Sequence, residues 1–230
     1  MFTTPTVTPS QPAASMGACA LRLVIVSTIF IAAYALANQL TGLRSDVGQG
    51  VFEFERAIPF VPWTIVPYLS VMGFYAASFF IGGRAALDRH SACVLVNLAL
   101  SLVCYALFPL RFQFERPLPP GLCGTLFQLL GLCDLPYNRA PSLHISVLLI
   151  LWLRLLPFIP ARWQGLMHVW FALIGVSVLT TYQHHLIDIP AGLAVGALSL
   201  FLTSPTATGW LKAALRTRSA GKTTHTLQCA

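Results

Sequence analysis

Long apolar runs separated by short polar stretches dominate this chain of 230 residues. Each run approaches the roughly 20 apolar residues that a helix needs to cross a bilayer, and none alternates with the period of two that marks a membrane β-strand. Because only helices and closed barrels satisfy their backbone hydrogen bonds in hydrocarbon, the pattern predicts an all-α, polytopic membrane protein. Six transmembrane helices are predicted, at residues 18–40, 63–83, 91–110, 141–156, 164–181 and 184–203.

The predicted spans form one membrane domain over residues 18–206, flanked by two segments of different composition. Residues 1–17 are rich in Thr, Pro, Ser and Ala and carry no charge, which indicates a disordered leader. Residues 207–230 hold four basic residues and are predicted to form a basic cytoplasmic tail. Ala-Leu-Ala at residues 35–37 resembles a signal-peptidase site, but only Arg22 is available as a positive n-region, so an uncleaved helix is the favoured interpretation.

Composition and charge agree with a membrane protein and argue against a nucleic-acid partner. The chain is 56% hydrophobic and 9% charged, and its net charge is +7. The basic residues lie singly in loops and in the tail, without the basic stripe and interleaved aromatics of a nucleic-acid-binding surface. If both termini are cytoplasmic, eight basic residues near the ends of the spans lie inside and five outside, as the positive-inside rule favours. This orientation puts residues 111–140 and the starts of the fourth and sixth spans outside the cytoplasm.

Two clusters that contain histidine interrupt the apolar pattern. Residues 141–144 read Pro-Ser-Leu-His, and residues 182–188 read Tyr-Gln-His-His-Leu-Ile-Asp. Ionisable residues in membrane segments are costly and are usually functional. At a helix start, His184 and Asp188 would lie on one face, where the carboxylate can hold and polarise the imidazole as a nucleophile. His144 can gain or release a proton near neutral pH and is therefore a candidate general acid.

An anion site can be assembled beside these histidines. Ser142 supplies a hydroxyl group, the start of the helix supplies free N–H groups, and Arg116 supplies a guanidinium that can grip two phosphate oxygens. Together with the histidines they predict a phosphate site that has a nucleophile on one side and a proton donor on the other.

The order and spacing of these residues resemble the type 2 phosphatidic acid phosphatase superfamily, which contains lipid phosphate phosphatases and relatives of the vanadium haloperoxidases. The signature of that family is Lys, six residues, Arg-Pro; then Pro-Ser-Gly-His; then Ser-Arg, five residues, His, three residues, Asp. The resemblance covers the third to the sixth predicted span. The positions that carry it are Arg116-Pro117, residues 141–144, Ser177, His184 and Asp188.

The resemblance implies a fold of six membrane helices and a reaction that passes through a phosphohistidine and needs no metal or cofactor. By position, it makes His184 the nucleophile, His144 the general acid and Asp188 the residue that orients His184. The metal-dependent alternative, a metal hydroxylase with histidine boxes, needs many more clustered histidines than the six in this chain.

Three positions depart from the family signature. Pro109 stands where the family has Lys, Val178 replaces the Arg of the third motif, and Leu143 replaces Gly. Arg111 and Arg139 are the candidates to supply the missing phosphate-binding cations. Leu143 and the tandem histidines are similar to bacterial members of the inositol phosphorylceramide synthase-like branch. These departures leave the lipid substrate open.

The sequence therefore predicts an integral membrane lipid phosphatase, in a bacterial inner membrane, with both termini cytoplasmic. We expect it to hydrolyse a phosphomonoester or pyrophosphate of a membrane lipid at the extracytoplasmic face. Phosphatidic acid, phosphatidylglycerophosphate or a polyprenyl pyrophosphate would fit. Two alternatives stay open: a phosphotransferase that passes the phosphoryl headgroup to a lipid alcohol or sugar, and a non-catalytic lipid-binding or transport protein.

Two further patterns lie outside these motifs. Residues 52–56 and 112–116 are nearly identical, Phe-Glu-Phe-Glu-Arg and Phe-Gln-Phe-Glu-Arg, which is typical of interfacial segments with Phe in lipid and charges in water. Arg56 is a candidate for a contact with a lipid headgroup or with the residues that bind phosphate. Gly192 and Gly196 lie one turn apart in the last span and are predicted to permit close helix packing.

Overall fold

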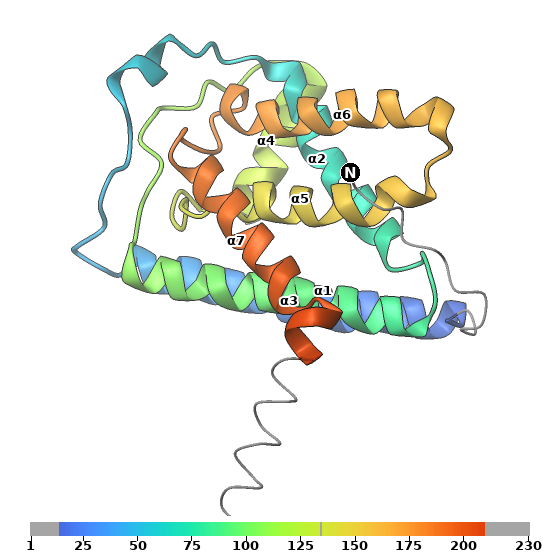
Figure 1. Ribbon diagram of the computed structural model, residues 1–230. Helices are drawn as coiled ribbons and strands as arrows, with labels where there is room; N and C mark the ends of the chain where they lie inside the picture. Colours follow the sequence, from blue (N-terminus) through green and yellow to red (C-terminus); the bar gives the residue numbers. More distant parts are fainter. Residues whose placement is uncertain (1–13, 134, 210–230) are drawn as a thin grey trace, which may run out of the picture.

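The computed structural model describes residues 14–133 and 135–209, and every regular element in these two ranges is a helix (Figure 1). The prediction of an all-α protein is confirmed. Short 3-10 turns at Glu53–Ala57, Pro62–Thr64 and Leu156–Phe158 supplement the α-helices. The α-helices are α1 (Met16–Gly42), α2 (Ile65–Ser78), α3 (Arg84–Leu107), α4 (Gly121–Cys133), α5 (Leu143–Leu155), α6 (Ala161–Thr180) and α7 (Asp188–Leu202).

Hydrogen bonds at one end of the bundle join loops that are far apart in the sequence. They link the loop after α1 to the end of α3, the entry of α2 to the end of α6, and the start of α5 to the start of α7. In these three bonds the backbone N–H of one residue donates to the backbone carbonyl oxygen of the other: Gly48 N–H to Pro109 (2.8 Å), Val61 N–H to Thr180 (2.8 Å) and Ser142 N–H to Asp188 (3.1 Å).

Side-chain contacts join the helices at the opposite end. Arg22, near the start of α1, pairs with Asp88, near the start of α3, at 2.7 Å. Arg154, near the end of α5, donates to the carbonyl oxygen of Ile81, just after α2, at 2.6 Å. Helices α1, α2, α3, α5, α6 and α7 therefore run alternately between the two ends, and α1 and α3 lie side by side along one side of the bundle (Figure 1).

Three helices of the described residues, α1, α3 and α6, are long and apolar enough to cross a membrane. Helices α2, α5 and α7 have only 14, 13 and 15 residues. A helix of 15 residues is about 22 Å long, whereas the hydrocarbon core is about 30 Å thick. The three long helices support membrane association, and the six crossings remain a prediction.

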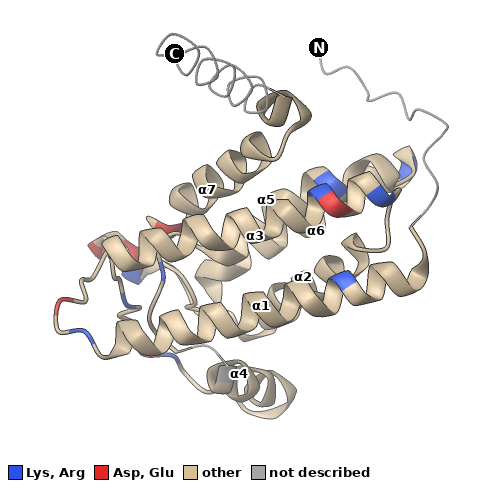
Figure 2. Ribbon diagram, turned by 90° about the horizontal axis from the view of Figure 1, so that it is seen from below, with Lys and Arg blue, Asp and Glu red and all other residues tan. Residues whose placement is uncertain are grey.

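The surface of the bundle agrees with a lipid environment. On α1, the apolar side chains Leu21, Val24, Ile31 and Leu36 are all more than half exposed. Many exposed apolar side chains on one long helix are typical of a surface that contacts a partner or a membrane. Figure 2 shows that the charged residues gather toward the two ends of the bundle, with uncharged helix between them.

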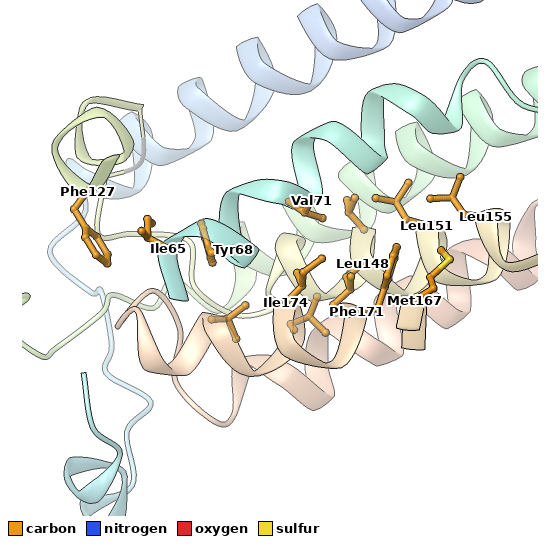
Figure 3. Close-up of a cluster of buried hydrophobic side chains, with 13 residues drawn as sticks. Ile65, Tyr68, Val71, Phe127, Leu148, Leu151, Leu155, Met167, Phe171 and Ile174 are labelled. Carbon is orange, nitrogen blue, oxygen red and sulfur yellow. The ribbon is translucent and has the colours of Figure 1, made fainter. Parts of the chain in front are cut away.

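The main apolar core lies between α2, α5 and α6 (Figure 3). Leu151, Phe171 and Ile174 are fully buried in it. Helix α4 contributes Phe127, whose ring lies 5.3 Å from the ring of Phe60. The segment 111–140, which lies between the third and fourth predicted spans, thus contains a helix that covers one end of the core.

Helices α5 and α7 pack backbone against backbone, as the glycines of the last span predicted. A Cβ atom on Gly192 would lie 2.6 Å from the carbonyl oxygen of Ser142, and one on Gly196 would lie 2.9 Å from that of Ser146. Both distances are shorter than real contacts, so only glycine fits. In the same layer, the buried Asn97 side chain of α3 donates to the Ser146 hydroxyl at 2.9 Å. The close packing is confirmed.

Some predicted boundaries were wrong. Ser15 caps α1 by accepting a hydrogen bond from the Ala18 N–H, so the last two residues of the predicted leader are helical. Helix α3 starts at Arg84, seven residues before its predicted start. Helix α7 starts at Asp188 instead of His184, because Pro190 is tolerated only in the first turn of a helix. Residues 1–13 of the leader, and the basic tail from residue 210 onward, lie outside the described residues.

Candidate active site

His184 and Asp188 face each other across the turn that precedes α7. His184 Nδ1 lies 3.2 Å from Asp188 Oδ2, and the same oxygen accepts a hydrogen bond from the His185 N–H at 2.8 Å. Asp188 is buried and is the first residue of α7, where the helix dipole favours a carboxylate. Since a carboxylate accepts, the His184 proton is assigned to Nδ1, and Nε2 keeps the lone pair that an attack on phosphorus needs.

The turn that carries His184 has an unusual backbone. The N–H groups of Gln183 and His184 both donate to the Val178 carbonyl oxygen, at 3.1 and 3.0 Å. Tyr182 has a φ of 53°, which a bulky residue rarely adopts and which costs about 1–3 kcal/mol. The Tyr182 hydroxyl donates to the Ile58 carbonyl oxygen at 2.9 Å. Contacts from other loops therefore hold this turn in a conformation that it would not adopt alone.

His144 lies in the first turn of α5, two positions after the capping residue Ser142. The Ser142 hydroxyl accepts a hydrogen bond from the Ile145 N–H at 3.3 Å, and the serine is fully buried. The His144 ring stacks on Tyr68, with ring centres 4.1 Å apart and an angle of 16° between the rings. Its Nε2 is buried and has no hydrogen-bond partner among the described residues. The ring is therefore oriented by stacking on Tyr68, and its Nε2 is available to form a hydrogen bond with a bound group.

The two histidine clusters meet. The Ser142 N–H donates to the Asp188 carbonyl oxygen at 3.1 Å, which fixes the start of α5 against the start of α7. His144 lies within electrostatic range of His184. The structure thus brings together His184, Asp188, Ser142 and His144, which are up to 46 positions apart in the sequence.

Two of the predicted cations, Arg116 and Arg139, lie beside this turn. Arg116 Nε donates to the Tyr182 carbonyl oxygen at 2.8 Å, and Arg139 Nη1 donates to the Gln183 carbonyl oxygen at 3.0 Å. Arg139 is fully buried. Both guanidinium groups bind carbonyl oxygens of the residues just before His184, so both help to shape the turn, and their predicted role as phosphate ligands stays a prediction.

Arg111 is placed differently from the other cations. Its side chain is exposed. With the Gln49 amide oriented so that its oxygen faces Arg111, this oxygen accepts a hydrogen bond from Arg111 Nη2 at 2.7 Å. Its backbone N–H donates to the Gly48 carbonyl oxygen at 3.1 Å. No described contact joins the Arg111 side chain to His184, His144 or Asp188. The structure does not bring Arg111 into the cluster.

Two buried residues beside the cluster, Glu55 and Gln183, were not predicted from the sequence to belong to the site. Glu55 is buried, and its Oε2 lies 3.0 Å from His185 Nδ1. Gln183 is fully buried, and neither atom of its side-chain amide has a hydrogen-bond partner among the described residues. The repeated Phe-x-Phe-Glu-Arg pattern pointed to the segment of Glu55, and Gln183 adjoins the histidines, but neither signal singled out the residue.

The burial of the two similar segments fits the interfacial prediction only in part. Phe52, Phe54 and Arg56 are exposed, as it predicted. Glu55 and Phe112, by contrast, are buried, because both segments fold over the turn at residues 182–186. The similar segments are thus part of the surroundings of the candidate site.

The chemistry that this cluster offers is that of an oriented imidazole beside a second histidine and two arginines. Within the described residues, no group of three or more His, Cys, Asp or Glu side chains is arranged to hold a metal ion. An oriented imidazole nitrogen, a second histidine that can exchange a proton and cationic groups are parts that a transfer of a phosphoryl group can use.

Comparisons of this chain with protein-family models, with curated proteins and with solved structures found no match. The geometry of the cluster is therefore the basis on which a function can be inferred.

Proposed function

We propose that this chain is an integral membrane lipid phosphatase that cleaves a phosphomonoester or pyrophosphate of a lipid through a phosphohistidine on His184. The observation that carries the proposal is the hydrogen bond from the Ser142 N–H to the Asp188 carbonyl oxygen, because it joins the His184–Asp188 pair to the helix start that bears His144. The resemblance of the three motifs to the type 2 phosphatidic acid phosphatase superfamily supports the same reaction.

The first step transfers the phosphoryl group to the protein. His184 Nε2 attacks phosphorus and forms a P–N bond, while the bond from phosphorus to the lipid oxygen breaks. His144 donates a proton to that oxygen, and Asp188 stabilises the positive charge that develops on the His184 ring. The N–H groups at the start of α5 and the guanidinium groups of Arg116 and Arg139 are proposed to bind the phosphate oxygens.

The second step releases phosphate. Water attacks the phosphohistidine, the P–N bond breaks, and His144 accepts the proton that the water loses. Inorganic phosphate leaves, and His184 and His144 return to their starting states. If an alcohol replaces water, the same site becomes a phosphotransferase, which is the alternative that the synthase-like resemblance favours.

The membrane arrangement belongs to the same proposal. Six helices alternate between two ends, and the candidate site lies at the end that holds the loops after α1, α3 and α6. We infer six crossings with both termini in the cytoplasm, so that the site faces the exterior. A reporter inserted at Thr125 in α4 should be accessible from outside, and a cytoplasmic location would contradict this orientation.

The proposal is tested with purified protein in detergent and EDTA, given a panel of lipid phosphates with and without alcohol acceptors. Phosphate release should persist in EDTA, and His184→Ala should abolish both the release and an acid-labile phosphorylated intermediate. His168→Ala is the matched control, since His168 accepts a hydrogen bond from the Trp152 ring N–H at 2.9 Å and has no described contact with the cluster. Turnover only with an acceptor would indicate the transferase, and full activity of His184→Ala would refute both reactions.

A further inference from the structure

The two neighbouring histidines, His184 and His185, have different surroundings. Both ring nitrogens of His185 are already engaged in hydrogen bonds within the protein. His185 is buried, its Nδ1 lies 3.0 Å from Glu55 Oε2, and its Nε2 accepts a hydrogen bond from the Gln113 N–H at 3.3 Å. Because a backbone N–H can only donate, Nε2 carries no proton. His185 is therefore a neutral ring whose Nδ1–H donates to Glu55.

Glu55 meets three N–H donors in a site that excludes water. Its Oε2 accepts from His185 Nδ1 and from the Leu186 N–H, both at 3.0 Å, and its Oε1 accepts from the Phe52 N–H at 2.9 Å. Glu55 is 1% exposed. A carboxylate is expensive to bury unless donors of this kind surround it, so Glu55 is tied to both the turn and its own loop.

The segment that carries Arg116 closes on the other faces of His185. The Phe112 ring stacks on it at 4.4 Å with an angle of 18°, and the Phe114 ring meets it edge-on at 5.0 Å. Two residues further, Arg116 Nε donates to the Tyr182 carbonyl oxygen at 2.8 Å. His185 is thus the point at which the loop of Glu55, the segment of Arg116 and the turn before α7 meet.

A continuous set of contacts leads from Glu55 to His184. Glu55 holds the ring of His185, and the N–H of His185 donates to Asp188 Oδ2 at 2.8 Å. That oxygen is the one that faces His184 Nδ1 at 3.2 Å. A displacement of His185 therefore changes the donors around Asp188 Oδ2 and the position of the carboxylate that orients His184.

We propose that Glu55 is a positioning residue, which acts through His185 to hold His184 against Asp188. Glu55 itself does not touch the substrate. The inference rests on the proposed function, because it takes His184 as the nucleophile. It divides the tandem pair into a nucleophile, His184, and an anchoring residue, His185.

Glu55→Gln tests the inference, because it keeps the size of the side chain but removes the charge and one acceptor. We expect kcat to fall about tenfold or more, with KM within about twofold, since the substrate contacts are unchanged and the nucleophile is misplaced. Glu53→Gln is the matched control: Glu53 is exposed, lies two positions earlier and carries the same charge. Unchanged kcat in Glu55→Gln, or an equal loss in both variants, would overturn the proposal.

A second pair of variants keeps the test informative if Glu55→Gln does not fold. His185→Asn retains a side-chain N–H that can reach Glu55, whereas His185→Ala does not. We expect His185→Asn to retain kcat within about threefold and His185→Ala to lose about tenfold or more. Equal activity of these two variants would contradict an anchoring role of the Glu55 contact.

A spectroscopic measurement separates this inference from the proposed function. In protein with ¹⁵N-labelled histidines, the signals of His185, assigned with His185→Ala, should show the proton on Nδ1, and Glu55→Gln should shift them while Glu53→Gln should not. A proton on Nε2 of His185 would overturn the positioning role whatever the activity. Full activity of His184→Ala would instead refute the proposed function, and the ¹⁵N signals would still decide whether Glu55 anchors His185.

Discussion

Gly192 of α7 lies against the backbone of Ser142, so close that a Cβ atom at position 192 would be 2.6 Å from the Ser142 carbonyl oxygen. The backbone cannot move aside as a flexible side chain would, so α5 and α7 would have to separate. These two helices carry His144 and Asp188. The spacing between the proposed acid, His144, and the carboxylate that orients the proposed nucleophile thus depends on the absence of a Cβ atom at position 192.

We expect Gly192→Ala to lower the free energy of unfolding by about 1–3 kcal/mol, as overpacking of a close contact does. Phosphate release should fall with it, because the Ser142–Asp188 hydrogen bond lies at the same contact. Gly165→Ala in α6 is the control, since nothing lies within 4 Å of a Cβ atom there. Thermal unfolding in detergent and phosphate release measure both effects, and equal behaviour of the two variants would refute the role of the close contact.

Asp188→Asn should lower kcat by about 100-fold or more, the range in which positioned acid–base groups contribute. The amide keeps the shape of the side chain but removes the charge that stabilises the His184 ring during attack. Asp46→Asn provides the comparison, because Asp46 is exposed and pairs with Arg44 at the surface at 2.6 Å. The measurement is the steady-state rate with a lipid phosphate, and kcat within threefold of the unmodified chain would argue against the proposed role of Asp188.

His144→Gln should discriminate between substrates according to their leaving groups. An alkyl oxygen needs a proton to leave, so its release should slow by about 100-fold or more, while a nitrophenol leaving group should be affected much less. The ratio of the two rates in His144→Gln and in His168→Gln checks the assignment. An equal loss for both leaving groups would remove His144 from the role of general acid.

Arg139→Lys should be more harmful to stability than Arg111→Lys. Arg139 is buried and donates to the carbonyl oxygens of Gln183 and Leu135, at 3.0 and 2.6 Å. A lysine cannot reproduce the guanidinium fork, and the lost bonds should cost about 1.5–3 kcal/mol. Arg111→Lys, at an exposed position, should leave the unfolding midpoint unchanged. Similar midpoints for the two variants would contradict a structural role of Arg139.

The helices of the bundle could be predicted from the sequence because their apolar runs are long. Each of the six runs corresponds to one helix among α1, α2, α3, α5, α6 and α7. The start of α7 was misjudged, although Pro190 marked it: a helix that began at His184 would have placed a proline beyond its first turn. Helix α4 was missed because charged residues flank its short apolar run.

The candidate site was predictable where its residues are close in sequence. The spacing of His184 and Asp188 was enough to predict their pairing, although a turn brings them together instead of the helix that was assumed. Arg111 and Arg139 looked equivalent in the sequence, and only tertiary contacts bury Arg139 and leave Arg111 at the surface. Glu55 had no local signal, because its burial depends on loops that follow much later in the chain.

The contact between Glu55 and His185 also bears on the order in which the protein is assembled. The two residues are 130 positions apart, and Leu186, another donor to Glu55, follows directly after His185. During synthesis the Glu55 carboxylate is made long before these two donors, so its site is completed only when the last turn and α7 arrive. A chain that ends before residue 185 retains just one of the three donors of Glu55, the Phe52 N–H. Without the other two donors, the Glu55 carboxylate would not be buried by the turn before α7.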